Sequence, residues 1–146
     1  MRRLKKLGFN DNFLLDVYKK EIRTVLEYAV QVWNGALTKK DSDRIERVQK
    51  IVLKFLLRQK YNSYTDACEN FGLQKLSARR EQLCSKFVLK EYKKDKDFFQ
   101  KVRKTPKRAV AKKKFVHEPK TRSQRHYSSC YVYLTRKLNK ILQSHE

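Results

Sequence analysis

The sequence predicts an all-α protein with four to six helices in a small bundle and a basic, partly disordered C-terminal linker. Three observations predict this fold: apolar residues recur every three and four positions, hydroxyl residues suited to helix caps precede these stretches, and glycines punctuate them. A chain of 146 residues can bury one modest core. We therefore expect a helical domain over residues 1–100, a basic linker over 101–128 and a short C-terminal helix over 129–146.

The first long helix is expected over residues 11–34. Its apolar face steps by three and four residues through Leu15, Tyr18, Ile22, Val25, Ala29 and Val32. Trp33 stands at its end and is expected to be buried, and Gly35 follows as a helix-ending residue.

A capping box, formed by Thr38 and Asp41, predicts the start of a second helix. This helix should run to about Gln59 and bury Ile45, Val48, Val52 and Phe55. Ser63 and Asp66 repeat the same pattern, so they predict a short helix that Gly72 ends.

Two further helices complete the expected bundle. One begins near Ser77 and buries Leu83, Cys84, Phe87 and Val88 before the charged run KKDKD. The other covers residues 131–142, close to the C-terminus.

The net charge is the strongest indication of a partner. Lys and Arg number 37 against 15 Asp and Glu, which gives a net charge of +22 and a sequence pI near 10.1. A field of this size attracts polyanions, and nucleic acid is the leading candidate. Residues 101–125 alone contain eleven Lys or Arg against the single acid Glu118. We expect no membrane partner, because the chain contains no lipidation motif and no apolar run long enough to span a bilayer.

No constellation for catalysis is visible. Nucleotide transfer needs clustered carboxylates that hold metal ions, and the aspartates here lie at helix starts or among lysines. There is no glycine-rich phosphate loop, and the cysteines and histidines lack metal-ligand spacing. We expect no enzyme activity, no cofactor and no metal. Three unpatterned cysteines favour an intracellular location, nucleus or cytoplasm.

Candidate phosphate contacts lie on the predicted helices and in the linker. They are Lys40, Arg44, Arg47, Lys54, Arg58, Arg79, Arg80, Lys107, Arg108, Lys112, Lys113 and Lys114. The helix cations fit a solvated face as well as a phosphate-binding one, whereas the linker charge exceeds what solubility needs. Tyrosines outside the predicted apolar faces are candidates for stacking on bases, namely Tyr61, Tyr64, Tyr127, Tyr131 and Tyr133.

Five segments occur in an order that resembles a known family. They are IRTVLEYAVQVWNGAL (Ile22–Leu37), RIERVQKIVLKFLL (Arg44–Leu57), YNSYTDA (Tyr61–Ala67), GLQKLSARREQLCSKF (Gly72–Phe87) and SCYVYLTRKLN (Ser129–Asn139). Together they resemble the segment that follows the polymerase palm in reverse transcriptases of non-LTR retrotransposons of the jockey kind. The last segment departs from the family pattern, because Cys130 and Val132 stand where the family usually has prolines.

The resemblance implies a thumb and post-thumb function. Helices of this region grip the template–primer duplex, while the catalytic aspartate pair belongs to a palm domain encoded upstream. We therefore expect a non-catalytic fragment of an RNA-directed DNA polymerase. Its partners would be RNA, DNA or a hybrid, bound without sequence specificity, and the missing palm domain of the parent polymerase.

Two alternatives stay open from the sequence. The chain could be a stand-alone basic protein that associates with RNA or chromatin, in which case no palm reading frame would precede it in the genome. It could also be a helical protein-interaction module whose charge serves solubility, in which case binding would be insensitive to salt.

Overall fold

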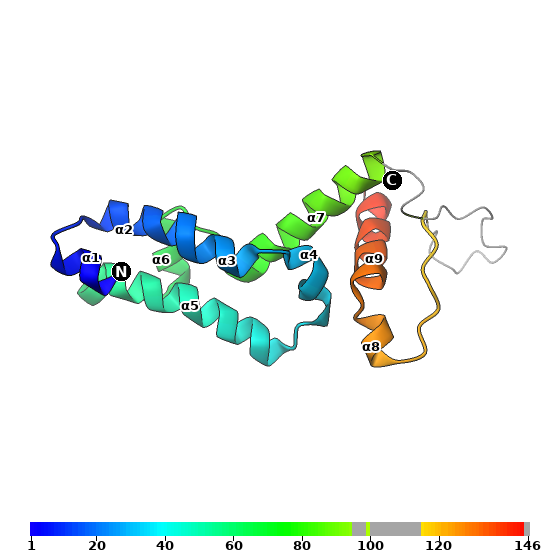
Figure 1. Ribbon diagram of the computed structural model, residues 1–146, viewed down its shortest axis with the longest axis horizontal. Coiled ribbons are helices and arrows are strands. Elements are labelled where there is room, and N and C mark those ends of the chain that lie inside the picture. The colour runs from blue at the N-terminus through cyan, green and yellow to red at the C-terminus, as the bar shows by residue number, and fades with distance from the viewer. Residues whose placement is uncertain (95–98, 100–114, 145–146) are drawn as a thin grey trace. The chain divides into compact units, whose positions relative to one another are not determined.

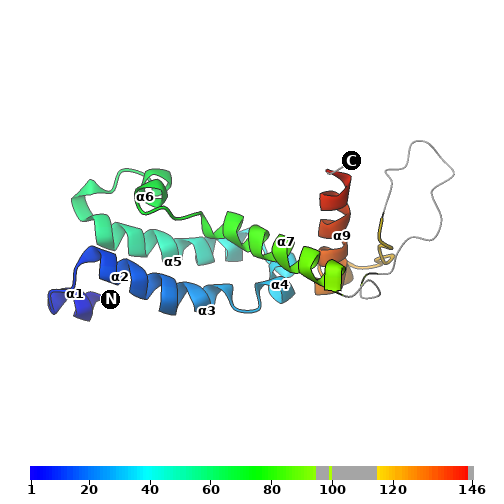
Figure 2. The same ribbon diagram turned by 90° about the horizontal axis from the view of Figure 1, so that it is seen from above.

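The computed structural model describes residues 1–94, 99 and 115–144, and these residues form helices without a β-strand (Figures 1 and 2). They fall into two compact units. The first unit comprises Met1–Val30 and Thr38–Arg80, and the second comprises Gln31–Leu37 and Glu81–Glu146. The all-α class is thus confirmed. The first unit ends at Arg80 instead of near residue 100, and residues 31–37 belong with the C-terminal part of the chain.

The first unit is built around α5 (Lys39–Leu57), a helix of 19 residues. Its elements are α1 (Arg2–Lys6), α2 (Asp11–Val17), the π-helix η1 (Tyr18–Ile22), α3 (Arg23–Glu27), α5 (Lys39–Leu57), the 3-10 turn η3 (Arg58–Lys60) and α6 (Tyr64–Asn70). Figures 1 and 2 both show α2 and α3 running alongside α5. Helix α7 (Leu76–Lys94) begins in this unit and continues into the second.

The predicted helix over residues 11–34 is not continuous. The π-helical turn η1 interrupts its α-helical repeat, and the helix breaks after α3, where Ala29 adopts a φ of +47°. A π turn contains more residues than an α turn, so it shifts the phase of every side chain after it. Val25 and Val32, predicted to be buried, are therefore 73% and 60% exposed.

Both predicted helix caps are confirmed. The Thr38 hydroxyl accepts a hydrogen bond of 3.2 Å from the backbone amide of Asp41, and α5 begins at Lys39, directly after Thr38. The Ser63 hydroxyl accepts one of 3.1 Å from the amide of Asp66 at the start of α6. These caps act within one turn, which explains why local sequence predicts them.

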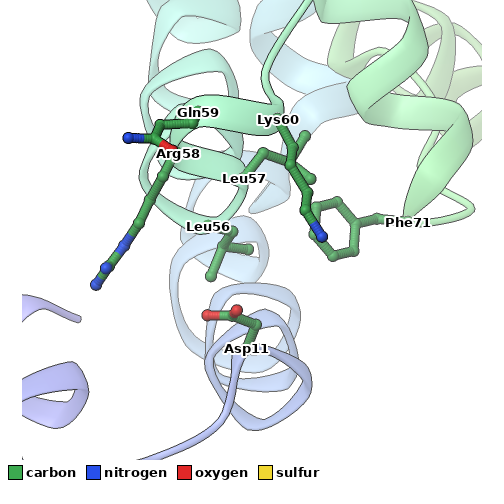
Figure 3. A pocket seen from close by; sticks show the side chains of 7 residues that line it. All are labelled: Asp11, Leu56, Leu57, Arg58, Gln59, Lys60 and Phe71. Atoms are coloured by element: carbon green, nitrogen blue, oxygen red, sulfur yellow. The ribbon is translucent and has the colours of Figure 1, made fainter.

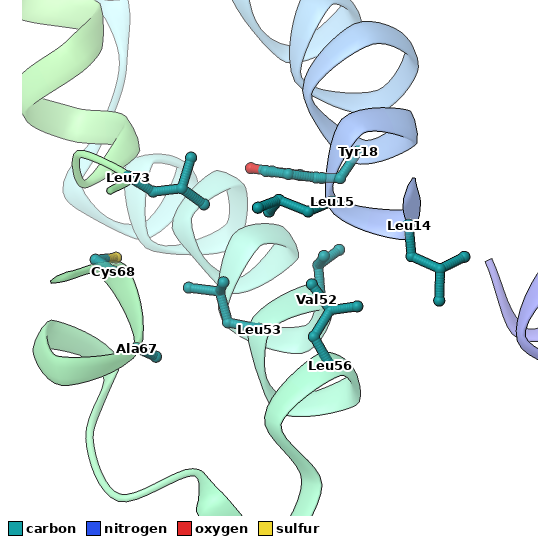
Figure 4. Packing of buried hydrophobic residues seen from close by; sticks show 9 residues of the cluster. All are labelled: Leu14, Leu15, Tyr18, Val52, Leu53, Leu56, Ala67, Cys68 and Leu73. Atoms are coloured by element: carbon teal, nitrogen blue, oxygen red, sulfur yellow. The ribbon is translucent and has the colours of Figure 1, made fainter. Parts of the chain in front are cut away.

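The core of the first unit lies where α2, α5 and α6 meet (Figure 4). Its buried members are Leu14, Leu15, Tyr18, Val52, Leu53, Leu56, Ala67, Cys68 and Leu73. Of the four residues predicted for the buried face of α5, only Val52 is buried, and the other three are half-buried. The buried face is rotated toward Glu46 and Gln49, two polar residues that the interior satisfies through hydrogen bonds.

The second unit has its own core. Val88, Phe99, Val116, Leu134 and Leu138 form it, from α7, α9 (Cys130–Gln143) and the chain that leads to α9. This unit also contains the 3-10 turn η2 (Asn34–Ala36) and α8 (Gln124–Tyr127), while α4 (Val30–Trp33) begins in the first unit and ends here. Trp33, predicted to be buried, is half-buried.

Part of the predicted basic linker is ordered. The Asn139 side chain of α9 accepts hydrogen bonds from the backbone amides of Phe115 and Val116 at 3.1 and 3.0 Å. The same side chain donates to the Val116 carbonyl at 3.0 Å. The buried Asn139 side chain thereby serves as acceptor for two backbone N–H groups and as donor to one backbone carbonyl of this segment. The remainder of the predicted linker, residues 101–114, lies outside the described residues.

Candidate nucleic-acid interface

Helix α5 presents a row of cations on the side opposite its buried face. Lys40, Arg47 and Lys54 are all exposed and recur every seven residues, which is close to two helical turns. Arg44 is exposed on the same side. At a rise of 1.5 Å per residue, the row from Lys40 to Lys54 spans about 21 Å. That length covers roughly six phosphates along one strand of a duplex.

Two further lysines extend this row and were not predicted from the sequence. Lys39 and Lys50 are exposed on α5, and Lys50 stands 5.1 Å from the centre of the Tyr64 ring. The position of Lys50, three residues after Arg47, was the available signal. We name the set Lys39, Lys40, Arg44, Arg47, Lys50 and Lys54 the α5 basic face.

The N-terminal half of the α5 basic face is hollowed. Lys39, Lys40, Arg44 and Arg47 line an open depression of about 570 Å³, with Asp43 as the only lining carboxylate. The neighbouring Asp41 accepts a hydrogen bond from the Thr38 hydroxyl, and with the Arg44 guanidinium at 3.2 Å this contact lowers the pKa of the Asp41 carboxyl. Asp41 is not among the lining residues, and four cations against the single carboxylate of Asp43 leave the lining of the depression net positive.

Arg58 lies beyond the C-terminal end of α5, in a conformation that L-residues rarely adopt. Its φ is +50°, and it lines a second depression of about 610 Å³ together with Lys60, Asp11 and the apolar residues Leu56, Leu57 and Phe71 (Figure 3). Lys54 stands 5.2 Å from the centre of the Tyr61 ring. The exposed Arg58 extends the predicted set of contacts past the helix end, but an acid accompanies it.

Arg79 and Arg80 do not belong to this surface. The Arg79 guanidinium contacts the Glu27 carboxylate, which Arg23 also approaches at 3.5 Å. Arg80 is only 3% exposed, donates a hydrogen bond of 2.6 Å to the Ser42 hydroxyl and lies 4.0 Å from the Glu46 carboxylate. Because burial withholds the Arg80 side chain from solvent, we correct its assignment from a phosphate contact to an internal ion pair.

Polar residues of the quoted segments meet inside the first unit. Gln49 accepts a hydrogen bond of 2.7 Å from the Tyr18 hydroxyl and donates to the Tyr64 hydroxyl and the Gln74 carbonyl, each at 3.0 Å. Burial raises the pKa of both phenols above the ordinary value, so they stay protonated donors. Tyr64 was a stacking candidate by sequence, but its hydroxyl donates a hydrogen bond to the Glu46 carboxylate.

The other predicted contacts have mixed positions. Lys107, Arg108, Lys112, Lys113 and Lys114 lie outside the described residues. In the second unit, Tyr131 packs against the core and Tyr133 is half-buried, whereas Tyr127 is 49% exposed. The Arg136 guanidinium stacks on the Tyr127 ring at 3.3 Å.

Within the described part of the chain, no group of three or more His, Cys, Asp or Glu side chains is placed to hold a metal ion. Burial raises the pKa of the Cys84 and Cys130 thiols, which disfavours a reactive thiolate. None of the described helices is long and apolar enough to cross a membrane.

Comparison of the chain with protein-family models, with curated proteins and with solved structures found no match.

Proposed function

We propose that this chain binds nucleic acid through the α5 basic face, without base specificity, as the thumb-type part of a non-LTR retrotransposon reverse transcriptase. The observation that carries the proposal is the row of six exposed cations along one side of α5. Contacts between lysine or arginine and phosphate position a duplex and are insensitive to its sequence. The net charge of +22 adds long-range attraction for the same partner.

The quoted sequence segments support the family part of the proposal. They resemble the region after the palm. Three of their residues, Glu46, Gln49 and Tyr64, are joined by hydrogen bonds in the first unit, because Tyr64 donates to Glu46 and accepts from Gln49. On this proposal the segments preserve a helical scaffold, and the scaffold displays the cations. The catalytic carboxylates would lie in a palm domain of the parent polymerase, so the chain alone would not extend a primer.

The test is the binding of the full chain to a short RNA–DNA hybrid over a series of salt concentrations. The six cations of the α5 basic face would neutralise about six phosphates, which gives a log–log slope of about −5 if the hybrid behaves like B-DNA. Replacing Arg44→Gln and Arg47→Gln together should make the slope shallower by about 2 and weaken binding roughly tenfold, which is about 0.7 kcal/mol per cation.

A matched control removes the same charge elsewhere in the first unit. Arg2 and Arg3 are exposed on α1, and their double replacement by Gln should leave the slope within 0.5 of the starting value, roughly half a phosphate contact. Equal effects of the two doubles would mean that only total charge matters, and the α5 assignment would be wrong. Primer extension by the purified chain would contradict its non-catalytic role.

The stand-alone alternative predicts the same binding and differs in its genomic context. An aspartate-pair palm reading frame directly upstream supports the polymerase assignment, and its absence from intact copies favours an independent RNA- or chromatin-associated protein.

A further inference from the structure

A second cationic site lies wholly within the second unit. A pocket of about 240 Å³ opens between η2, the end of α8 and one side of α9. The α9 side contributes Tyr133, Arg136, Lys137 and Lys140, whose spacing of three and four residues places them on one face of the helix. Figure 1 shows α8 beside the N-terminal end of α9.

One wall of the pocket contains a close contact between Gly35 and Tyr133. A Cβ atom on Gly35 would stand 2.6 Å from the Tyr133 Cγ, so only glycine lets the ring lie against the backbone. The Tyr133 hydroxyl donates to Glu81 at 3.0 Å and accepts from the Asn34 amide at 2.9 Å. These contacts hold the wall in place before any ligand arrives.

A flat stacking surface forms the side of the pocket. The Arg136 guanidinium lies 3.3 Å from the centre of the Tyr127 ring and donates a hydrogen bond of 3.2 Å to the Tyr127 carbonyl. Its Nε donates to Glu118. The guanidinium thus lies over the Tyr127 ring and is held by polar partners in two segments, and guanidinium planes are surfaces on which unpaired bases stack.

Charge at the pocket favours an anion. Three cations line it against one carboxylate, that of Glu81, which contacts the Lys137 ammonium. Lys140 is exposed at the same face, and no carboxylate of the described chain lies within 4 Å of its ammonium. Lys140 is therefore the cation that can bind a phosphate without first breaking an internal ion pair.

We infer that this pocket takes one unpaired nucleotide of a single-stranded nucleic acid, with the base against Arg136 and Tyr127 and the phosphate at Lys140. At about 240 Å³ the pocket is smaller than the roughly 300–1,000 Å³ of pockets that enclose drug-sized ligands, so it would hold the base alone, with the sugar and phosphate outside it beside Lys140. Bases in a duplex are stacked on their neighbours and cannot enter. The site is thus distinct from the α5 basic face, which suits a duplex backbone, and it does not depend on that proposal.

The experiment uses the full chain with a fluorescent eight-nucleotide single-stranded RNA and a blunt RNA duplex of the same length. Arg136→Lys keeps the positive charge and removes the planar guanidinium group on which the base would stack. Base stacking is worth about 1–3 kcal/mol, so the single strand should bind at least about fivefold more weakly, while the duplex stays within about twofold. Arg125→Lys, the same change at an exposed position of α8, should alter neither.

A second variant guards against a folding defect. Lys140 is exposed, so Lys140→Gln should retain the helical circular dichroism and still weaken single-strand binding severalfold. Single-strand affinity within twofold of the unchanged chain in both Arg136→Lys and Lys140→Gln overturns the inference. So does equal competition by an octaglutamate peptide, which would show a general polyanion site. A single-stranded DNA arm shows whether the 2′-hydroxyl contributes.

The α5 double variant separates this inference from the proposed function. Loss of hybrid binding with an intact Arg136→Lys effect on single strands would support both sites independently. If the α5 double variant binds the hybrid as tightly as the unchanged chain, while Arg136→Lys still weakens single-strand binding, only the proposed duplex site is wrong.

Discussion

The Glu46 carboxylate on α5 accepts a hydrogen bond of 2.9 Å from the backbone amide of Leu76, the first residue of α7. It accepts a second bond of 3.0 Å from the Ser77 amide and a third from the Tyr64 hydroxyl. A helix N-terminus normally takes such a cap from its own flanking residue. Here the cap comes from another helix, so one acid joins α5, α6 and α7.

Removing this cap should destabilise the first unit. Glu46→Ala leaves two backbone amides and the half-buried Tyr64 hydroxyl without their acceptor, at a cost of about 3 kcal/mol in the free energy of unfolding. Urea unfolding followed by circular dichroism measures this loss. Glu69→Ala, at an exposed acid of α6, is the matched control and should change stability by less than about 0.5 kcal/mol. Equal losses in the two variants would refute the capping role of Glu46.

The buried Arg80 and the exposed Arg47 should respond in opposite ways to the same substitution. Arg80→Gln leaves the buried Glu46 carboxylate without its cation, and we expect a loss of about 3 kcal/mol with no change in the salt slope of nucleic-acid binding. Arg47→Gln should leave stability nearly unchanged and reduce the slope by about 1. A reduced slope in folded Arg80→Gln would contradict the internal assignment.

Adding one methyl group at Gly35 should disturb Tyr133. The new Cβ would lie 2.6 Å from the Tyr133 Cγ, so the ring must move, and overpacking of this kind costs about 1–3 kcal/mol. Thermal unfolding gives the cost, and the NMR signals of the Tyr133 ring report the displacement. Gly72→Ala is a useful comparison, because its φ of +58° imposes strain while no atom crowds the added Cβ. Unchanged Tyr133 signals in Gly35→Ala would contradict the close contact.

The Glu81 carboxylate should contribute to the acid sensitivity of the second unit. Burial tends to raise its pKa, but the contacts from Lys137, Tyr133 and Asn34 outweigh burial and hold the pKa below the ordinary 4.5. A lowered pKa stabilises the folded state above about pH 4.5, and this stability is lost as pH falls through the folded value. Since Glu81 is largely exposed, the effect on the melting temperature should be a few degrees at most.

Melting temperatures of the unchanged chain and of Glu81→Gln between pH 3 and pH 7 check this prediction. The difference between them should be present near neutral pH and shrink toward pH 3. A difference that stays constant over this range would mean that the carboxylate charge has no part in stability.

The helix starts could be predicted because their causes are local. Thr38 and Ser63 each cap a helix through an amide only three residues away, and both helices begin where the sequence placed them. The π-helical turn at Tyr18–Ile22 had no such local mark. One insertion of this kind shifted the face of the following residues and exposed Val25, which the simple repeat had placed in the core.

Part of the candidate site could also be predicted, because it depends on residues close together in the sequence. Lys40, Arg47 and Lys54 repeat at helical spacing, so their common face follows from α5 alone. Arg80 looked equivalent in sequence, yet Ser42 and Glu46, which lie 38 and 34 positions earlier, take its side chain. The contact between Gly35 and Tyr133 likewise joins residues far apart in the chain.

By itself, the sequence determined the helical class, the caps of α5 and α6 and the excess of positive charge, because each depends on composition or on residues within about one turn. Only the tertiary structure decided which cations remain exposed and which are held by acids in the interior. The physical reason is that a buried charge needs a partner, and the partner of Arg80 is supplied by a distant segment that becomes its neighbour only on folding.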